Sequence, residues 1–160
     1  MKIRKPIHDN WGTPQIVLNL IEMEFGKFFD PCPLNSKFDG LSIDWGKVNY
    51  INPPYNRKDK ELFIRKAFEE SQKGNTCVML LPVSTSTVIF HEVIYPYAEI
   101  RFLKRRVKFI GINTKGEKVT NKCGMHDSMI VIFRPHGKRQ LKKLGYLRDI
   151  NWEATNDKLA

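Results

Sequence analysis

The sequence predicts an α/β fold whose sheet is mostly parallel, with an antiparallel hairpin at one edge. Short apolar runs that are typical of buried strands occur at residues 48–51, 76–81 and 128–133. Stretches of ten or more residues whose apolar positions have helical spacing alternate with the predicted strands, and this alternation favours parallel strands. Residues 107–110 and a return near Lys118 enclose a turn at 113–116, which predicts the edge hairpin.

The first part of the chain is expected to hold a basic arm, one helix and one short strand. The arm covers residues 1–10. Thr13 is suited to cap the following helix and Pro14 to be its first residue. Gly26 is suited to end that helix, and residues 27–29 then form the strand.

Two more helices and another strand are expected in the middle of the chain. Asp59 should cap a helix that runs to about Lys73. The hydroxyl-rich segment 84–87 should cap a helix that extends to about Ile94. Residues 98–103 have the composition of a further strand.

Composition and charge describe one domain covering residues 1–160, with a polar basic tail at 136–160. No apolar run is long enough to cross a membrane. The three cysteines are far apart and the four histidines lack metal-ligand spacing, so we expect free thiols, a cytoplasmic location and no metal. The net charge of +10 predicts a polyanionic partner such as nucleic acid, the alternative being a merely soluble basic surface.

The segment Asn52-Pro53-Pro54-Tyr55 carries groups suited to an amine on a planar base. Two prolines end the preceding strand, so the segment lies at a strand's carboxyl end, where open α/β sheets bind ligands. The side-chain oxygen of Asn52 and the carbonyl oxygen of Pro53 can each accept a hydrogen bond from the amine, and Tyr55 offers a stacking face. Two acceptors would bend the amine towards tetrahedral geometry and aim its lone pair at an electrophile. An ordinary turn is the alternative.

Two other segments could line a small-molecule pocket. Asp30 and Pro31 follow the strand at 27–29, where the carboxylate could accept hydrogen bonds from a cofactor; an Asx turn is the alternative. Trp11 precedes a helix N-terminus, whose N–H groups could face a carboxylate; a hydrophobic staple is the alternative. A glycine-rich phosphate cradle is absent from the sequence.

Basic residues form two clusters that suit phosphate groups. The first, residues 101–109, interleaves aromatic side chains with Lys104, Arg105, Arg106 and Lys108. The second spans residues 134–143. Ser84 and Thr85 follow another strand at the same predicted edge and are further candidates for contacts to nucleic acid. A solvated strand face is the alternative for a single basic run.

Six motifs follow one another between Trp11 and Phe133: Trp11-x-Thr13-Pro14, Phe29-Asp30-Pro31, Asp39-Gly40-Leu41 with Trp45, Asn52-Pro53-Pro54-Tyr55, Leu80-Leu81-Pro82, and Arg105 or Arg106 with Phe109. Together they resemble the phage-type DNA N6-adenine methyltransferases, the small Dam-like family. The resemblance implies a Rossmann-like methyltransferase fold, a three-layer sandwich. It also implies transfer of a methyl group from S-adenosylmethionine to the N6 amine of a flipped adenine in DNA.

The resemblance also assigns residues to roles. It places Asn52, Pro53, Pro54 and Tyr55 at the adenine, and Trp11, Thr13, Asp30, Pro31 and Asp44 near the cofactor. The sequence departs from many methyltransferases because it lacks the glycines beside the methionine moiety. Asp39 and Asp44 are both candidates for the acid that binds the cofactor ribose.

Two other functions fit the same observations. One is a methyltransferase-like module that binds nucleic acid without turnover, and the other is methylation of adenine in RNA. The chain leaves little room for a separate target-recognition domain, so we expect a short target sequence or low specificity, with dimerisation as a possible aid. The expected setting is the cytoplasm of a phage-infected or prophage-carrying bacterium.

Overall fold

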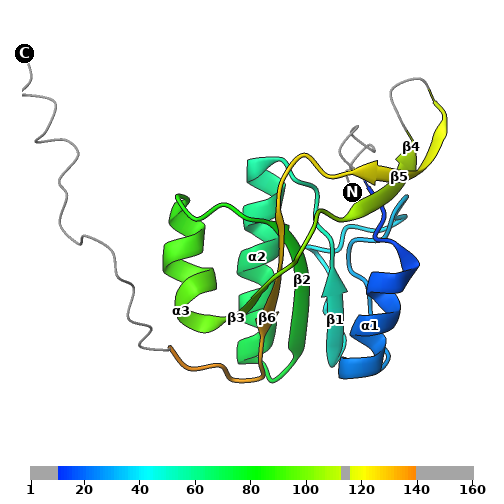
Figure 1. Cartoon of the computed structure of the whole chain (residues 1–160). Coiled ribbons are helices and arrows are strands. Elements are labelled where there is room, and N and C mark those ends of the chain that lie inside the picture. Colours follow the sequence, from blue (N-terminus) through cyan, green and yellow to red (C-terminus); the bar gives the residue numbers. More distant parts are fainter. Residues whose placement is uncertain (1–10, 113–115, 140–160) are drawn as a thin grey trace, which may run out of the picture.

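The computed structural model describes residues 11–112 and 116–139 (Figure 1). The predicted arm at 1–10, the tip of the predicted hairpin at 113–115 and most of the predicted tail, 140–160, lie outside the described residues. The helices are α1 (Gln15–Phe25), α2 (Arg57–Gln72), the π-helix η1 (Phe90–Ile94) and α3 (Tyr95–Tyr97). The strands are β1 (Val48–Ile51), β2 (Thr76–Pro82), β3 (Glu99–Phe102), β4 (Lys108–Ile112), β5 (Lys118–Cys123) and β6 (Ser128–Phe133).

The main sheet is mixed rather than mostly parallel. Its four strands have the order β1-β2-β6-β3. Only β1 and β2 pair in parallel, while β6 is antiparallel to both β2 and β3. The predicted hairpin forms, but β4 and β5 make a separate two-stranded sheet instead of an edge of the main one. The expected Rossmann-like three-layer sandwich with a mostly parallel sheet is therefore wrong.

The strand β6 explains the error. All six of its residues are buried, which is the burial pattern expected for a parallel strand covered on both faces. Burial is decided by what covers the two faces, whereas strand direction is decided by how the chain returns to the sheet. Here the chain returns through the β4–β5 sheet and enters between β2 and β3 from the opposite end.

The two faces of the main sheet bury different clusters. Alternate residues of β2 and β6, with Ile51 of β1, pack against α2 and η1 on one face. The other residues of these strands, with Tyr50, pack against Ile21 of α1 and against Val107 and Phe109 at the start of β4. In Figure 1, α1 and α2 lie on opposite sides of the sheet. Within the described residues, no helix has both the length and the apolar character that crossing a bilayer requires.

The predicted strand at 27–29 is reduced to one bridge. Phe29 pairs in parallel with Asn49 of β1. Its N–H donates to the Val48 carbonyl at 2.9 Å, and its carbonyl accepts from the Tyr50 N–H at 3.0 Å. This bridge sets Asp30, the next residue, beside β1.

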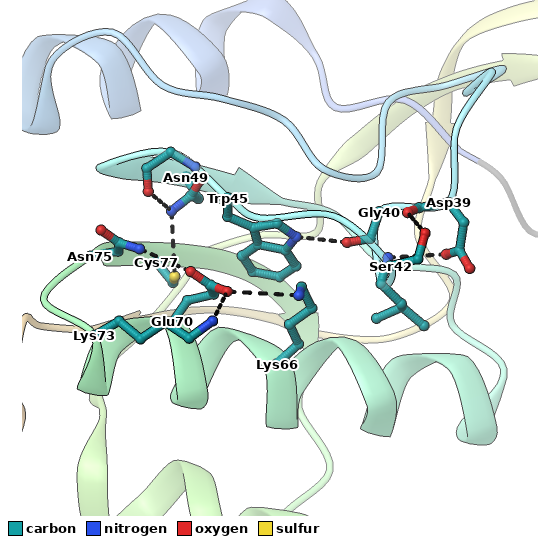
Figure 2. Close-up of polar contacts among 12 residues, drawn as sticks. Asp39, Gly40, Ser42, Trp45, Asn49, Lys66, Glu70, Lys73, Asn75 and Cys77 are labelled. Carbon is teal, nitrogen blue, oxygen red and sulfur yellow. Dashed lines mark hydrogen bonds and ion pairs between the residues drawn. The ribbon is translucent and has the colours of Figure 1, made fainter.

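Side-chain hydrogen bonds fix the start of β1 (Figure 2). Asn49 is fully buried; its amide donates to the Gly46 and Thr76 carbonyls and accepts from the Gly46 N–H. Glu70, also buried, accepts from Lys73 and from Asn75 in the turn before β2. Because buried polar groups are costly when unpaired, these bonds oppose any slip of β1 against β2.

The helix starts differ from their predictions in detail. α1 begins at Gln15 with Pro14 at the N-cap position, and no side chain caps it, so Thr13 is not a capping residue. Asn56 caps α2 by accepting from the Asp59 N–H, which puts Asp59 in the first turn. The segment 84–87 precedes a π-helical turn rather than a regular α-helix.

Candidate active site

Three loops meet at one edge of the main sheet. β1, β2 and β3 run in the same direction, because β6 is antiparallel to both β2 and β3 and β1 is parallel to β2. Their carboxyl ends therefore share an edge, which we call the carboxyl edge. The loops that leave it are 52–55 after β1, 83–87 after β2 and 103–107 after β3. These loops carry most of the residues that the sequence singles out.

Asn52 is held by the backbone of a distant segment. Its Nδ2 donates to the Trp11 carbonyl oxygen at 2.7 Å. A carbonyl can only accept, so this bond fixes which end of the amide faces Trp11. Within residues 11–112 and 116–139, no donor contacts the Asn52 Oδ1, and the side chain is only half-buried. The amide thus keeps an oriented acceptor at the carboxyl edge.

Tyr55 turns its hydroxyl inward. The ring packs against the core cluster of Tyr50 and Phe109, and it forms a T-shaped pair with Phe109 at a centroid distance of 6.1 Å. The hydroxyl is buried and has no hydrogen-bond partner in the described structure. Burial raises the pKa of Tyr55, so the hydroxyl stays a donor. A buried donor without an acceptor is uncommon and marks a place where a bound molecule could supply one.

Asp30 lies in the same region and is a weaker acid than usual. Its Oδ1 accepts from the Cys32 N–H at 2.8 Å, which is the Asx turn that was the alternative for this residue. Burial raises the pKa of Asp30 to about 6, and the Cys32 hydrogen bond opposes this only in part. After burial, the charges of Tyr55 and Asp30 also raise the pKa of Tyr50, so each of these two groups lies within electrostatic range of Tyr50.

Tyr50 joins the helix start to the strand. Its hydroxyl and the Thr13 Oγ1 are 2.8 Å apart and share a hydrogen bond. Tyr50 is buried, and this burial is the main reason that its pKa is raised. The structure therefore brings Thr13 and Asp30 to one place, through a tyrosine that sequence reasoning missed. Tyr50 could have been found from its position, because it lies on the predicted strand two residues before Asn52.

The two candidate ribose-binding acids lie in different surroundings. Gly40 is pressed against Pro31: a Cβ on Gly40 would overlap the Pro31 carbonyl oxygen. The Trp45 Nε1 donates to the Gly40 carbonyl at 2.7 Å, which holds the loop in this position (Figure 2). Asp39 is thereby next to the Asp30 loop.

Asp44 has a different neighbour. It is exposed, and its charge acts on Lys73 at the end of α2. Because α2 starts after the carboxyl end of β1 and runs back along the sheet, Lys73 lies at the opposite edge. Of the two acids, Asp39 is therefore the one whose loop lies against the Asp30 loop.

The first basic cluster adjoins the loop after β2. The N–H of Val83 and the Arg106 Nε both bond to Asp127, at 2.8 and 3.3 Å, so the two loops share one support. Lys104, Arg105, Arg106 and Lys108 are exposed, as is Thr85, while Ser84 is half-buried. The carbonyls of Ser84 and Thr85 accept hydrogen bonds from Thr87 and His91, which shapes their loop.

The second basic cluster is partly outside the described residues. Arg134 forms an ion pair with Glu99 at 2.9 Å and lies over the Phe25 ring, at the end of β6 away from the carboxyl edge. Arg134 is thus exposed but already paired with Glu99, and it lies far from the carboxyl edge. In the part of the chain that the structure describes, no three His, Cys, Asp or Glu side chains gather closely enough to hold a metal ion.

The chain belongs to the DNA N-6-adenine-methyltransferase (Dam) family, whose model matches residues 1–154. Among curated proteins, it is similar to the DNA N-6-adenine-methyltransferase of Escherichia phage T1. The two are 32% identical over 111 residues, covering 61% of this chain and 46% of that protein. The chain thus spans about half the length of the curated relative it matches. No solved structure matches it. Family membership confirms the resemblance drawn from the motifs, whereas the roles of individual residues stay predictions.

The raised pKa of Asp30 predicts an unusual dependence of stability on pH. The folded-state pKa, about 6, is above the ordinary 3.8. The folded state therefore favours protonated Asp30, and this contribution is lost as the pH rises from 3.8 through 6. Asp30→Asn keeps an acceptor for the Cys32 N–H and carries no charge. At pH 8 it should raise the free energy of unfolding by up to about 3 kcal/mol. This figure follows because the pKa rises from 3.8 to about 6, and each pKa unit corresponds to about 1.4 kcal/mol.

Urea unfolding of both proteins at pH 4 and pH 8 checks this. The stability difference between Asp30→Asn and the unmodified protein should be large at pH 8 and small at pH 4. Asp127→Asn, which neutralises an exposed carboxylate, is the matched control. A difference that does not change with pH would mean that Asp30 is not desolvated.

Proposed function

We propose that this protein transfers a methyl group from S-adenosylmethionine to the N6 amine of a flipped adenine in DNA. The observation that carries the proposal is the orientation of Asn52, whose Nδ2 is bound by the Trp11 carbonyl so that Oδ1 is left as an acceptor. Membership of the Dam family and similarity to the phage T1 protein support the reaction and the DNA substrate. The cofactor and the flipped base are this proposal's own additions.

The residues near Asp30 fit the cofactor chemically. S-adenosylmethionine carries an amino group, a carboxylate and a ribose, and when bound it supplies an electrophilic methyl group. The Asp30 carboxylate suits the cationic amino group, and the unpaired Tyr55 hydroxyl is a donor for an anionic or hydroxyl oxygen. Asp39 suits the ribose hydroxyls. Trp11 and Thr13 border the same region through their contacts to Asn52 and Tyr50.

The residues of the 52–55 loop act on the adenine amine. Asn52 Oδ1 and the Pro53 carbonyl oxygen each accept a hydrogen bond from one of its two N–H groups, which directs the nitrogen lone pair away from the ring plane. Pro53 and Pro54 have fixed φ angles, so the acceptors are positioned without further ordering. Extruding a base costs a few kcal/mol, and stacking on Tyr55 would offset part of that cost.

The exposed cations after β3 would bind the phosphates that flank the flipped base. Lys104, Arg105, Arg106 and Lys108 lie at the carboxyl edge, beside the loop that holds Ser84 and Thr85. Positive charge at this edge supports binding of the DNA backbone there. The proposal also includes a single domain, assembly as a homodimer, and a location in the cytoplasm of a phage-infected or prophage-carrying bacterium.

Asn52→Ala should abolish methyl transfer, because it removes the oriented acceptor while Pro53 and the fold remain. Tyr55→Ala should do the same by removing the stacking face, and Tyr55→Phe, which keeps the ring, should retain much more transfer than Tyr55→Ala. Labelled methyl incorporation into adenine-containing DNA, with nucleoside analysis of the product, measures this. Glu69→Gln, an exposed change on α2 near the opposite edge, is the control. Full transfer by Asn52→Ala would refute the role of the amide, and the same assay with RNA tests the alternative substrate.

Cofactor binding separates the enzyme from a silent binding module. Calorimetric titration with S-adenosylmethionine should show binding that strengthens as the pH rises through about 6, because Asp30 becomes an anion there. Asp30→Asn should weaken this binding and remove the pH dependence attributable to Asp30. A folded, unmodified protein that gives no binding signal at any pH would favour the silent module.

DNA affinity should fall steeply as salt rises, because each phosphate contact releases counterions. Lys104→Ala and Lys108→Ala should each reduce the slope of log affinity against log salt by about 1. Arg134→Ala removes the same charge at the other end of β6, where Arg134 is paired with Glu99, and should leave the slope unchanged. Fluorescence anisotropy over a salt series gives these slopes; equal slopes for all four proteins would exclude the first basic cluster from the interface.

A further inference from the structure

We propose that Gly111 and the backbone of Trp11 are positioning residues that set the orientation of the Asn52 amide. This inference rests on the proposed function, because it explains how the acceptor in that reaction is kept in place. Residues 11–13, which we call the strap, cross from β4 to the end of β1. The strap links the small β4–β5 sheet to the carboxyl edge of the main sheet.

The strap is held at three points. Its first residue accepts the hydrogen bond from the Asn52 Nδ2 at 2.7 Å. Its second, Gly12, forms an antiparallel bridge with Ile110 of β4, with N–H···O distances of 2.5 and 2.9 Å. Its third, Thr13, shares a hydrogen bond with the buried Tyr50 hydroxyl. The Trp11 carbonyl therefore has little freedom to follow the Asn52 amide if that amide rotates.

The glycine at position 111 lets the Trp11 ring lie against β4. A Cβ on Gly111 would overlap the Cε3 atom of Trp11 and lie 2.8 Å from Cζ3. Real Cβ atoms do not approach a ring this closely, so any side chain at 111 must displace the indole. Gly111 has no positive φ, so its backbone conformation is open to alanine. The absence of a side chain at 111 is thus required by the ring and not by the backbone.

The direction of the amide decides whether it helps the reaction. With Nδ2 bound to Trp11, the Asn52 oxygen is available to accept from the amine. If the carbonyl of Trp11 moves away, the amide can rotate and present its NH2 group, which repels the hydrogens of the substrate amine. Displacement of the strap should therefore lower the rate of the chemical step without removing any group that touches DNA.

Gly111→Ala tests the inference. We expect kcat for DNA methylation to fall on the order of 10- to 100-fold, as a displacement of about 1 Å can cause, while KM for DNA changes little. Ile112→Ala, the next position on β4 with an exposed side chain, is the matched control and should leave kcat unchanged. Circular dichroism and the urea midpoint of each variant show whether it folds.

A double-mutant cycle separates positioning from general damage. Trp11→Ala removes the ring that a Cβ at 111 would strike, so Gly111→Ala should cause no further loss in the Trp11→Ala background. If Gly111→Ala does not fold, Tyr50→Phe, which removes one hydroxyl that holds the strap, should lower kcat several-fold with KM for DNA retained. Normal kcat in Gly111→Ala, or equal losses in both backgrounds, overturns the inference. If the unmodified protein transfers no methyl group, the proposed function fails instead.

Discussion

The end of β1 is the constraint on which the site depends. The strand is buried on both faces, and its start is fixed by the hydrogen bonds of Asn49. Pro53 and Pro54 cannot extend the β1–β2 ladder, so the chain must leave the sheet directly after Asn52. A rigid strand that ends abruptly gives the next side chains a fixed origin. The backbone of β1 therefore positions Asn52 better than a flexible loop could.

Two polar groups in the region around Asp30 destabilise the folded protein. Burial disfavours the charged form of Asp30, and the Tyr55 hydroxyl is buried without an acceptor. An unpaired buried polar group costs about 1–3 kcal/mol. A ligand with a cationic group for Asp30 and an oxygen for Tyr55 would relieve both costs. Such local instability is typical of binding sites, and this is why the two groups support a cofactor site more strongly than either does alone.

Sequence reasoning found the elements better than their arrangement. The strands at 48–51, 76–81 and 128–133 were predicted almost to the residue, because apolar runs between turn residues depend on local sequence. The direction of β6 was not predictable in this way, since a strand buried on both faces has the same composition in either direction. The order β1-β2-β6-β3 depends on contacts between residues far apart in the chain.

The same distinction holds for the site. Asn52 and Asp30 were singled out because their positions after strands follow from local patterns. The bond from Asn52 to Trp11 spans 41 residues and the pair Thr13–Tyr50 spans 37, so neither could be read from spacing. Thr13 shows the limit most clearly: its place before Pro14 indicated a helix cap, yet its hydroxyl is used by a buried tyrosine. A hydroxyl bonds to whichever partner the tertiary structure brings close.

The β4–β5 sheet supports residues of the proposed site as well as packing against the core. Ile110 and Gly111 hold the strap, and Phe109 forms a T-shaped pair with the Tyr55 ring. Two of the residues proposed to act on the adenine are therefore supported by the same strand, Asn52 through the strap and Tyr55 through Phe109. β4 also begins with Lys108, directly after the basic loop that we assign to phosphates. The same strand therefore carries the first of the proposed phosphate contacts and supports the two side chains at the end of β1.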